Sequence, residues 1–176
     1  MHAEIIIVEP FALVLDWSGD WDGAVLSSLH LQWSDAPGLD QESPNLSPYA
    51  RELKAKLTEL VAGRPCQWPE LPAGSFAAAG LTDFAARVYE ELRAQVGRGE
   101  TITYGALAEL AGRPGAARAV GRIMANNPWP MIYPCHRVIG AGRKLTGFGG
   151  GDGLMMKDRL LRLEGCDGPW ADYPRR

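Results

Sequence analysis

The segment 64–80, RPCQWPELPAGSFAAAG, divides the chain into two parts of different character. Its three prolines and two glycines interrupt both helices and strands, so no long regular element runs through it. We therefore expect an irregular connection that ends in a domain boundary. This predicts an N-terminal α/β support domain over residues 1–80 and a C-terminal domain over residues 81–176.

The first part has the pattern of short strands followed by one helix. Ile5–Val8, Phe11–Leu15 and Val25–Trp33 are rich in β-branched, aromatic and other apolar residues, which favours strands. Ser47 and Pro48 indicate a helix start, since serine caps a helix N-terminus and proline suits the first helical position. The first domain is thus predicted to be a small sheet with a helix.

The second part has apolar residues at helical spacing. The pattern predicts two helices capped by Thr82 and Thr103, a third over 116–126 and a final helix from about residue 153 to residue 163. The second and third helices are short and joined by a tight turn, which is typical of a helix-turn-helix. The residues expected to face inward from these two helices and the last one are Leu107, Leu110, Val120, Ile123, Met124, Met156, Leu160 and Leu163.

Composition limits the class of protein. The chain is 46% apolar and 22% charged, which is typical of a globular protein and excludes a disordered tail. No apolar run approaches the roughly 20 residues that span a bilayer, and no basic leader is evident, so we expect a cytoplasmic protein without membrane contact. The three cysteines form no CxxC pair, so we expect free thiols and no bound metal or other cofactor.

Charge is unevenly distributed between the two parts. Residues 1–80 hold four basic and eleven acidic residues, whereas residues 81–176 hold 14 basic and 10 acidic ones. The net charges of −7 and +4 single out the second part as the candidate for binding an anionic partner. Chance variation of surface charge is the alternative explanation.

Cys135 is the strongest candidate for chemistry. It lies after the predicted helix-turn-helix, follows the restricted backbone of Pro134 and is flanked by His136 and Arg137. Two neighbouring cations are expected to lower the pKa of the thiol toward the reactive thiolate. A neighbouring histidine is expected to act through a water, with a carboxylate orienting its other nitrogen. The alternative is a small buried hydrophobic residue without a chemical role.

Several stretches, in order along the second part, resemble the O6-alkylguanine-DNA alkyltransferases, also called methylated-DNA–protein-cysteine methyltransferases. The stretch 134–138, PCHRV, is similar to the active-site motif of that family. The resemblance covers about residues 82–165, whereas residues 1–80 show only a general likeness. The other similar stretches are 103–108 (TYGALA), 116–121 (AARAVG), 127–128 (NP), 145–150 (LTGFGG) and 160–165 (LLRLEG).

The resemblance implies catalytic roles for five residues. Cys135 is implied to be the nucleophile and final acceptor of the alkyl group, and His136 to pass the thiol proton through water toward Glu164. Tyr104 is implied to donate a hydrogen bond or proton to the departing guanine. Asn127 is implied to hold the turn beneath the site.

The resemblance also implies how DNA is bound. Arg118 is implied to enter the duplex and fill the space left by an extruded nucleotide, because an enzyme that acts on a stacked base must first flip it out. The other residues implied to contact DNA are Thr103, Tyr104, Ala117 and Gly121. The residues implied to line the base pocket are Met124, Pro130, Val138, Phe148 and Gly149.

Fold, partner and reaction follow as expectations from this resemblance. The fold class is α/β (α+β), with a small sheet-plus-helix domain followed by a winged-helix-like helix-turn-helix domain that carries the active-site loop. The expected partner is double-stranded DNA containing O6-alkylguanine, bound by a monomer. The expected reaction is one irreversible alkyl transfer for each protein molecule, because a thioether is stable to water.

Three other functions are weighed against this one. A lesion sensor would bind the damaged base without chemistry, but the sensors of this type replace the cysteine that is present here as Cys135. A sequence-specific regulator would use the same helix-turn-helix and leave a defined footprint. A thiol hydrolase would turn over repeatedly, but the sequence shows no recognisable oxyanion-hole motif.

Overall fold

The chain divides into two compact units in the computed structural model. The N-terminal unit consists of Met1–Gly80 with Pro128–Ile132, and the C-terminal unit consists of Leu81–Asn127 with Tyr133–Arg176. The sequence-based division had placed residues 128–132 in the second domain, whereas their contacts place them in the first unit. The residues that the structure describes are 2–19, 24–39, 41–148, 153–168 and 170.

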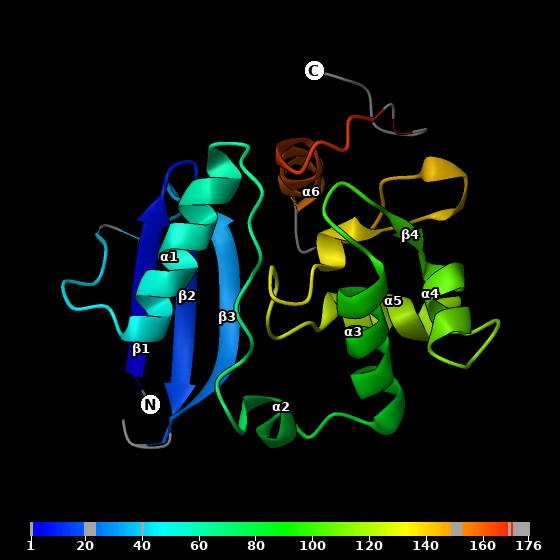
Figure 1. Ribbon diagram of the computed structural model, residues 1–176, viewed down its shortest axis with the longest axis horizontal. Coiled ribbons are helices and arrows are strands. Elements are labelled where there is room, and N and C mark those ends of the chain that lie inside the picture. Colours follow the sequence, from blue (N-terminus) through cyan, green and yellow to red (C-terminus); the bar gives the residue numbers. More distant parts are fainter. Residues whose placement is uncertain (1, 20–23, 40, 149–152, 169, 171–176) are drawn as a thin grey trace. The chain divides into compact units, whose positions relative to one another are not determined.

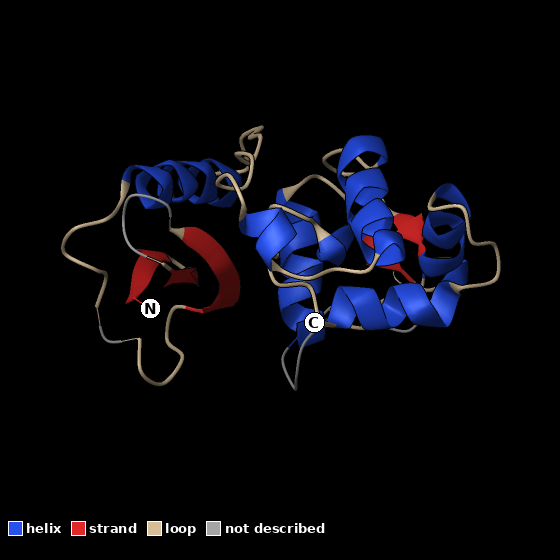
Figure 2. Cartoon of the chain, turned by 90° about the horizontal axis from the view of Figure 1, so that it is seen from below, coloured by secondary structure: helices blue, strands red, loops and turns tan. Residues whose placement is uncertain are grey.

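The N-terminal unit is a three-stranded antiparallel sheet with a helix across one face (Figures 1 and 2). The strand order is β1-β2-β3, so each strand pairs with its neighbour in sequence. The predicted strands and helix are confirmed, while the short helix α2 within the irregular segment was not predicted. The elements are β1 (His2–Val8), β2 (Phe11–Ser18), β3 (Val25–Trp33), α1 (Pro48–Val61) and α2 (Ser75–Ala78).

The helix α1 begins where the sequence indicates. The Ser47 hydroxyl accepts a hydrogen bond from Ala50 N at 3.1 Å, which satisfies a backbone donor of the first turn, and Pro48 occupies the first helical position. Leucines of α1 at helical spacing are fully buried, as are alternate residues of the strands. The fully buried residues of this core include Ile6, Phe11, Leu13, Leu15, Leu53, Leu57 and Leu60.

The segment 128–132 is held in the N-terminal unit by one buried tryptophan. The Trp129 indole is fully buried, and its Nε1 donates to the Leu26 carbonyl oxygen at 2.8 Å. Its ring stacks on Phe76 at a centroid distance of 6.0 Å. The Pro128 carbonyl accepts from Leu29 N at 2.7 Å. The chain between the helix-turn-helix and Cys135 is therefore anchored on strand β3.

The C-terminal unit contains the predicted helix-turn-helix, formed by α4 and α5, and packs α3 against it (Figure 1). A two-residue parallel ladder joins β4, just before α4, to β5, just after the Cys135 turn. This ladder brings the start of α4 beside the reactive segment. The elements are α3 (Asp83–Gln95), β4 (Ile102–Thr103), α4 (Tyr104–Leu110), α5 (Ala117–Ala125), the 3-10 turn η2 (Cys135–Arg137), β5 (Val138–Ile139), the 3-10 turn η3 (Ala141–Arg143) and α6 (Gly153–Leu163).

Both predicted threonine caps are confirmed. The Thr82 hydroxyl accepts from Ala85 N at 3.2 Å, and the Thr103 hydroxyl accepts from Ala106 N at 3.1 Å. One predicted inward residue is wrong: Leu110 is 45% exposed, because α4 is only seven residues long and its last turn presents that position to solvent. Of the other seven, Ile123 and Leu163 are half-buried and the rest are buried.

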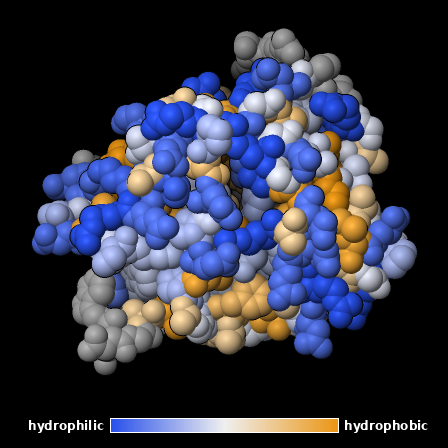
Figure 3. Space-filling view, in the orientation of Figure 1, coloured by the Kyte–Doolittle hydropathy of each residue, from blue (hydrophilic) through white to orange (hydrophobic). Residues whose placement is uncertain are grey.

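Hydrophilic side chains cover most of the surface seen in Figure 3, with apolar atoms in separate patches. None of the helices in the described part of the chain has the length and apolarity that a membrane span requires.

We predict that Trp129→Phe lowers the free energy of unfolding by about 1–3 kcal/mol, because phenylalanine fills much of the same space but leaves the buried Leu26 carbonyl without its donor. Urea denaturation followed by circular dichroism measures this change. Trp33→Phe, at a half-buried position, is the control and is expected to change stability less. Equal effects of the two substitutions would contradict the anchoring role of Trp129.

Candidate active site

Cys135 begins a short turn whose start is held by hydrogen bonds to the Tyr133 carbonyl. The Tyr133 carbonyl accepts two hydrogen bonds, from Asn127 Nδ2 at 2.7 Å and from Cys135 N at 2.8 Å. Asn127 also hydrogen-bonds to the Cys135 side chain. The Asn127 side chain therefore contacts both the Tyr133 carbonyl and the Cys135 thiol. The structure places this sequence-predicted residue beside Cys135.

The electrostatic setting of the thiol differs from the sequence-based expectation. Cys135 is buried, and burial raises the pKa of its thiol, since a thiolate is poorly solvated in the interior. Asn127, the cation of Lys157 and nearby backbone amides act in the opposite direction. The expectation that His136 and Arg137 lower this pKa is wrong, because both side chains turn toward Glu164 instead.

Glu164 is the buried centre of a charged cluster at the C-terminal end of α6. Arg137 donates to both of its oxygens, from Nε to Oε2 and from the terminal nitrogen Nη2 to Oε1, each at 2.9 Å. The remaining terminal nitrogen Nη1 of Arg137 donates to the Val96 carbonyl at 2.6 Å. His136 Nε2 lies 3.0 Å from Glu164 Oε1. Burial alone would raise the pKa of Glu164. These partners nevertheless hold that pKa well below its usual range.

His136 is fully buried, which lowers the pKa of its imidazole, although Glu164 opposes that change. The ring is therefore neutral at pH 7. With Nε2 facing the carboxylate, the proton of the neutral ring belongs on Nε2, and Nδ1 is left as the acceptor. Both ring nitrogens are buried, and among the described residues neither makes an aligned hydrogen bond, so the 3.0 Å contact of Nε2 with Glu164 is a close approach to the carboxylate.

Lys157, on α6, is a second buried charged group near the thiol. Its Nζ donates to the Val138 carbonyl at 2.5 Å and to the Thr146 carbonyl at 2.6 Å. Burial lowers its pKa to about 8, and attraction to the Cys135 thiolate opposes that change. Lys157 is thus a charged neighbour that favours the thiolate, in the role expected for Arg137.

Tyr104, at the first position of α4, is linked to the same carbonyl as Lys157. Its hydroxyl donates to the Thr146 carbonyl at 3.2 Å, and burial raises the pKa of its phenol. Gly147 has a positive φ of 70°, and a Cβ atom there would lie 2.6 Å from the Tyr104 hydroxyl. A residue without a side chain is therefore required for Tyr104 to occupy this position.

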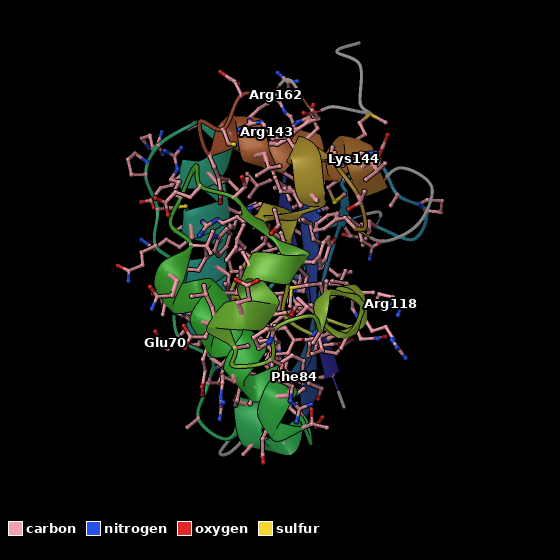
Figure 4. The ribbon with its side chains drawn as sticks, turned by 90° about the vertical axis from the view of Figure 1, so that its right-hand side faces the viewer. Glu70, Phe84, Arg118, Arg143, Lys144 and Arg162 are labelled. Carbon is pink, nitrogen blue, oxygen red and sulfur yellow. The ribbon has the colours of Figure 1, made fainter. Side chains whose placement is uncertain are left out.

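A groove of about 400 Å³ lies against the helix-turn-helix. Arg118 is exposed near the start of α5 and projects outward in Figure 4. All five sequence-predicted DNA-contact residues line this groove. Its lining is Thr103, Tyr104, Gly105, Ala117, Arg118, Gly121 and Ala141.

The structure places only three of the five residues predicted to line the base pocket in the C-terminal unit's described part. Met124 and Val138 are buried in the C-terminal unit, where Val138 accepts the Lys157 hydrogen bond. Phe148 is half-buried with a positive φ of 83°. Pro130 belongs to the N-terminal unit, and Gly149 lies outside the described residues.

Comparison with known proteins agrees with the geometry. Residues 83–166 match the DNA-binding domain of 6-O-methylguanine DNA methyltransferase. The crystal structure of Mycobacterium tuberculosis O6-methylguanine methyltransferase aligns with a TM-score of 0.66 and 34% identity over 97% of this chain and 96% of that one. This chain belongs to the O6-methylguanine-DNA methyltransferase family. The M. tuberculosis OGT protein in complex with DNA aligns equally well, with a TM-score of 0.66 and 34% identity over 94% of this chain and 93% of that one.

Sequence similarity within the family is concentrated in the C-terminal unit. The methylated-DNA–protein-cysteine methyltransferase of M. tuberculosis strain H37Rv is 51% identical over 88 residues, which are 50% of this chain and 52% of that protein. By sequence, the chain therefore spans about half the length of this curated relative. The structural alignment extends the likeness to the N-terminal unit, so the expected α/β (α+β) fold class is confirmed.

Sequence reasoning missed one residue of this site, Lys157, and one pairing, that of Arg137 with Glu164. Lys157 lies three and four residues before the buried Leu160 and Leu161, and a lysine on the apolar face of an amphipathic helix is the signal that would have found it. The pairing of Arg137 with Glu164 has no comparable signal, because the two residues lie 27 positions apart.

We predict that Glu164→Gln lowers the free energy of unfolding by about 3–5 kcal/mol, since the buried Arg137 guanidinium loses its counter-charge. The carboxylate pKa is lowered in the folded protein, so its stabilisation is complete above about pH 4.3 and is lost as the pH falls below that value. Urea unfolding from pH 7 to pH 3 tests both points. Glu109→Gln, at an exposed position of α4, is the control, and an equally small effect of both substitutions would contradict the prediction.

We predict that Lys157→Met raises the pKa of the Cys135 thiol, because a nearby cation that favours the thiolate is removed. The pH profile of Cys135 alkylation by iodoacetamide, read by peptide mass mapping, is expected to move to higher pH. Lys56→Met in the N-terminal unit is the control. A profile that does not move would show that Lys157 has no electrostatic influence on the thiol.

Proposed function

We propose that this protein repairs O6-alkylguanine in double-stranded DNA by transferring the alkyl group irreversibly to Cys135. The observation that carries the proposal is a buried thiol in the same compact unit as a helix-turn-helix, with the His136–Glu164 pair beside it. The complex of the M. tuberculosis relative with DNA supports DNA as the partner. We also propose that the protein acts as a monomer in the cytoplasm and without a metal or other cofactor.

DNA binding is assigned to the groove and the helices around it. The groove residues contact the duplex, and the damaged nucleotide is flipped out of the stack toward Cys135, at a cost of a few kcal/mol. Arg118 is exposed near the start of α5 and fills the space that the nucleotide leaves. Met124, Val138 and Phe148 of the C-terminal unit supply walls of the base pocket.

The chemical step is a displacement at the alkyl carbon. The Cys135 sulfur forms a bond to that carbon as the bond from carbon to guanine O6 breaks. The thiol proton passes through a water to Nδ1 of the neutral His136. Glu164 then pairs with the imidazolium but does not take the proton itself, because Arg137 keeps the pKa of the carboxyl low.

The departing guanine needs a proton, which Tyr104 supplies from its hydroxyl. This leaves a phenolate, and Lys157 Nζ, 6.0 Å from the centre of the Tyr104 ring, favours that charge. Return of the proton from His136 through solvent restores Tyr104. The product on Cys135 is a neutral thioether, so each protein molecule acts once.

Incubation with a duplex containing O6-methylguanine, followed by intact-mass measurement and peptide mapping, tests the proposal. We expect a mass gain of one methyl group, located on Cys135, and no further gain with excess substrate. Cys135→Ala is expected to show none, because it lacks the nucleophile. Binding without a mass change in the wild-type protein would favour a lesion sensor, and repeated turnover would favour a hydrolase.

We predict that Tyr104→Phe slows methyl transfer on the order of 10²-fold, since the proton donor is removed while the ring that lines the groove is kept. Single-turnover quench kinetics measures the rate, and anisotropy with the same duplex measures affinity, which is expected to change little. A variant that transfers the methyl group at the wild-type rate would remove Tyr104 from the mechanism.

A further inference from the structure

Helix α5 carries two arginines on the side that faces away from the core. Val120 and Met124, one turn apart, are the buried residues of this helix. Arg118 and Arg122 each precede one of them by two positions, which is about 200° around a helix with 3.6 residues per turn. Both arginines are exposed. Their side chains therefore leave the helix on its solvent side, one turn apart.

The charges of these two arginines are not neutralised within the described part of the chain. Neither side chain forms an ion pair or hydrogen bond with a described residue, and α5 itself has no acidic residue. Like charges four positions apart on a helix repel each other. Arg122 lies in the last turn, where the helix dipole favours a cation but does not remove its charge. The pair is thus suited to an anionic partner.

The backbone of Arg122 is held beside the DNA-binding groove. Gly121, the residue before it, lines the groove together with Arg118. A Cβ atom on Gly121 would lie 4.0 Å from the Tyr104 ring, so α5 packs closely against the start of α4 at this point. Asn126 Nδ2 donates to the Arg122 carbonyl at 2.8 Å at the end of the helix. Arg122 therefore projects from an ordered turn of helix at the margin of the groove.

The spacing of the two arginines fits a duplex on which Arg118 is inserted. Four residues of a helix span about 6 Å along its axis. One DNA strand carries a phosphate about every 3.4 Å along the duplex axis. With Arg118 inside the duplex, Arg122 therefore lies within the same few nucleotides and reaches their backbone. Its planar guanidinium matches the geometry of phosphate oxygens.

We propose that Arg122 binds a backbone phosphate beside the flipped nucleotide and so positions α5 for the entry of Arg118. This inference rests on the proposed function. The guanidinium donates paired N–H hydrogen bonds to the phosphate oxygens. A contact of this kind fixes the register of the protein on DNA and carries no sequence information. Arg122 is thus a positioning residue that touches neither the reacting alkyl group nor Cys135.

The salt dependence of binding to an undamaged duplex tests this contact without methyl transfer. Each phosphate contact contributes about −0.9 to the slope of log affinity against log salt concentration. Arg122→Gln removes the charge and keeps a similar helix propensity, so we expect the slope to become shallower by about 0.9. The ratio of wild-type to variant affinity should then fall about 3.5-fold between 50 and 200 mM salt. The change should be the same on duplexes of unrelated sequence.

Two further variants make the test specific. Arg122→Lys keeps the charge and is expected to keep the wild-type slope, because the slope counts neutralised phosphates. Arg64→Gln, at an exposed position of the N-terminal unit, removes the same charge and is expected to leave the slope unchanged. Thermal melting checks that all three variants are folded.

The outcomes separate the phosphate contact from the proposed function. An unchanged slope in Arg122→Gln, the same loss of slope in Arg122→Lys, or an equal change in Arg64→Gln overturns the contact. If the wild-type protein binds the duplex but does not methylate Cys135, the proposed repair function fails, and the slopes still decide whether Arg122 binds phosphate. If the wild-type protein does not bind the duplex at low salt, both are overturned.

Discussion

The site depends on one buried carboxylate, Glu164, at the end of α6. It binds Arg137 through two hydrogen bonds and lies 3.0 Å from His136, so it ties both residues that follow Cys135 to another helix. Burying an isolated charge is costly, and a carboxylate in this position is stable only with such partners. The orientation of the reactive turn therefore follows from the need to neutralise this charge.

The same cluster determines how the thiol can react. Burial raises the pKa of Cys135, so the resting residue is a thiol and needs a base close by. His136 is neutral because of its own burial, and Glu164 makes it able to accept a proton as an ion pair. Lys157 and Asn127 favour the thiolate from other directions.

Local features of the fold could be predicted from the sequence, because they depend on neighbouring residues. The caps at Ser47, Thr82 and Thr103 are confirmed. They were predictable because each is a hydrogen bond between a hydroxyl and the backbone amide only three residues later. The directions of side chains were less predictable. Arg137 is next but one to Cys135 and yet turns away from it, because its partner Glu164 comes from a distant segment.

The most direct test of this account is the protonation state of His136. Nitrogen NMR of the imidazole, with the protein labelled at histidine, reports both the charge and the tautomer. The account predicts a neutral ring at pH 7, protonated on Nε2 toward Glu164 and free at Nδ1 to accept the thiol proton. An imidazolium at pH 7, or a proton on Nδ1, would leave no acceptor facing away from Glu164 and would contradict the mechanism.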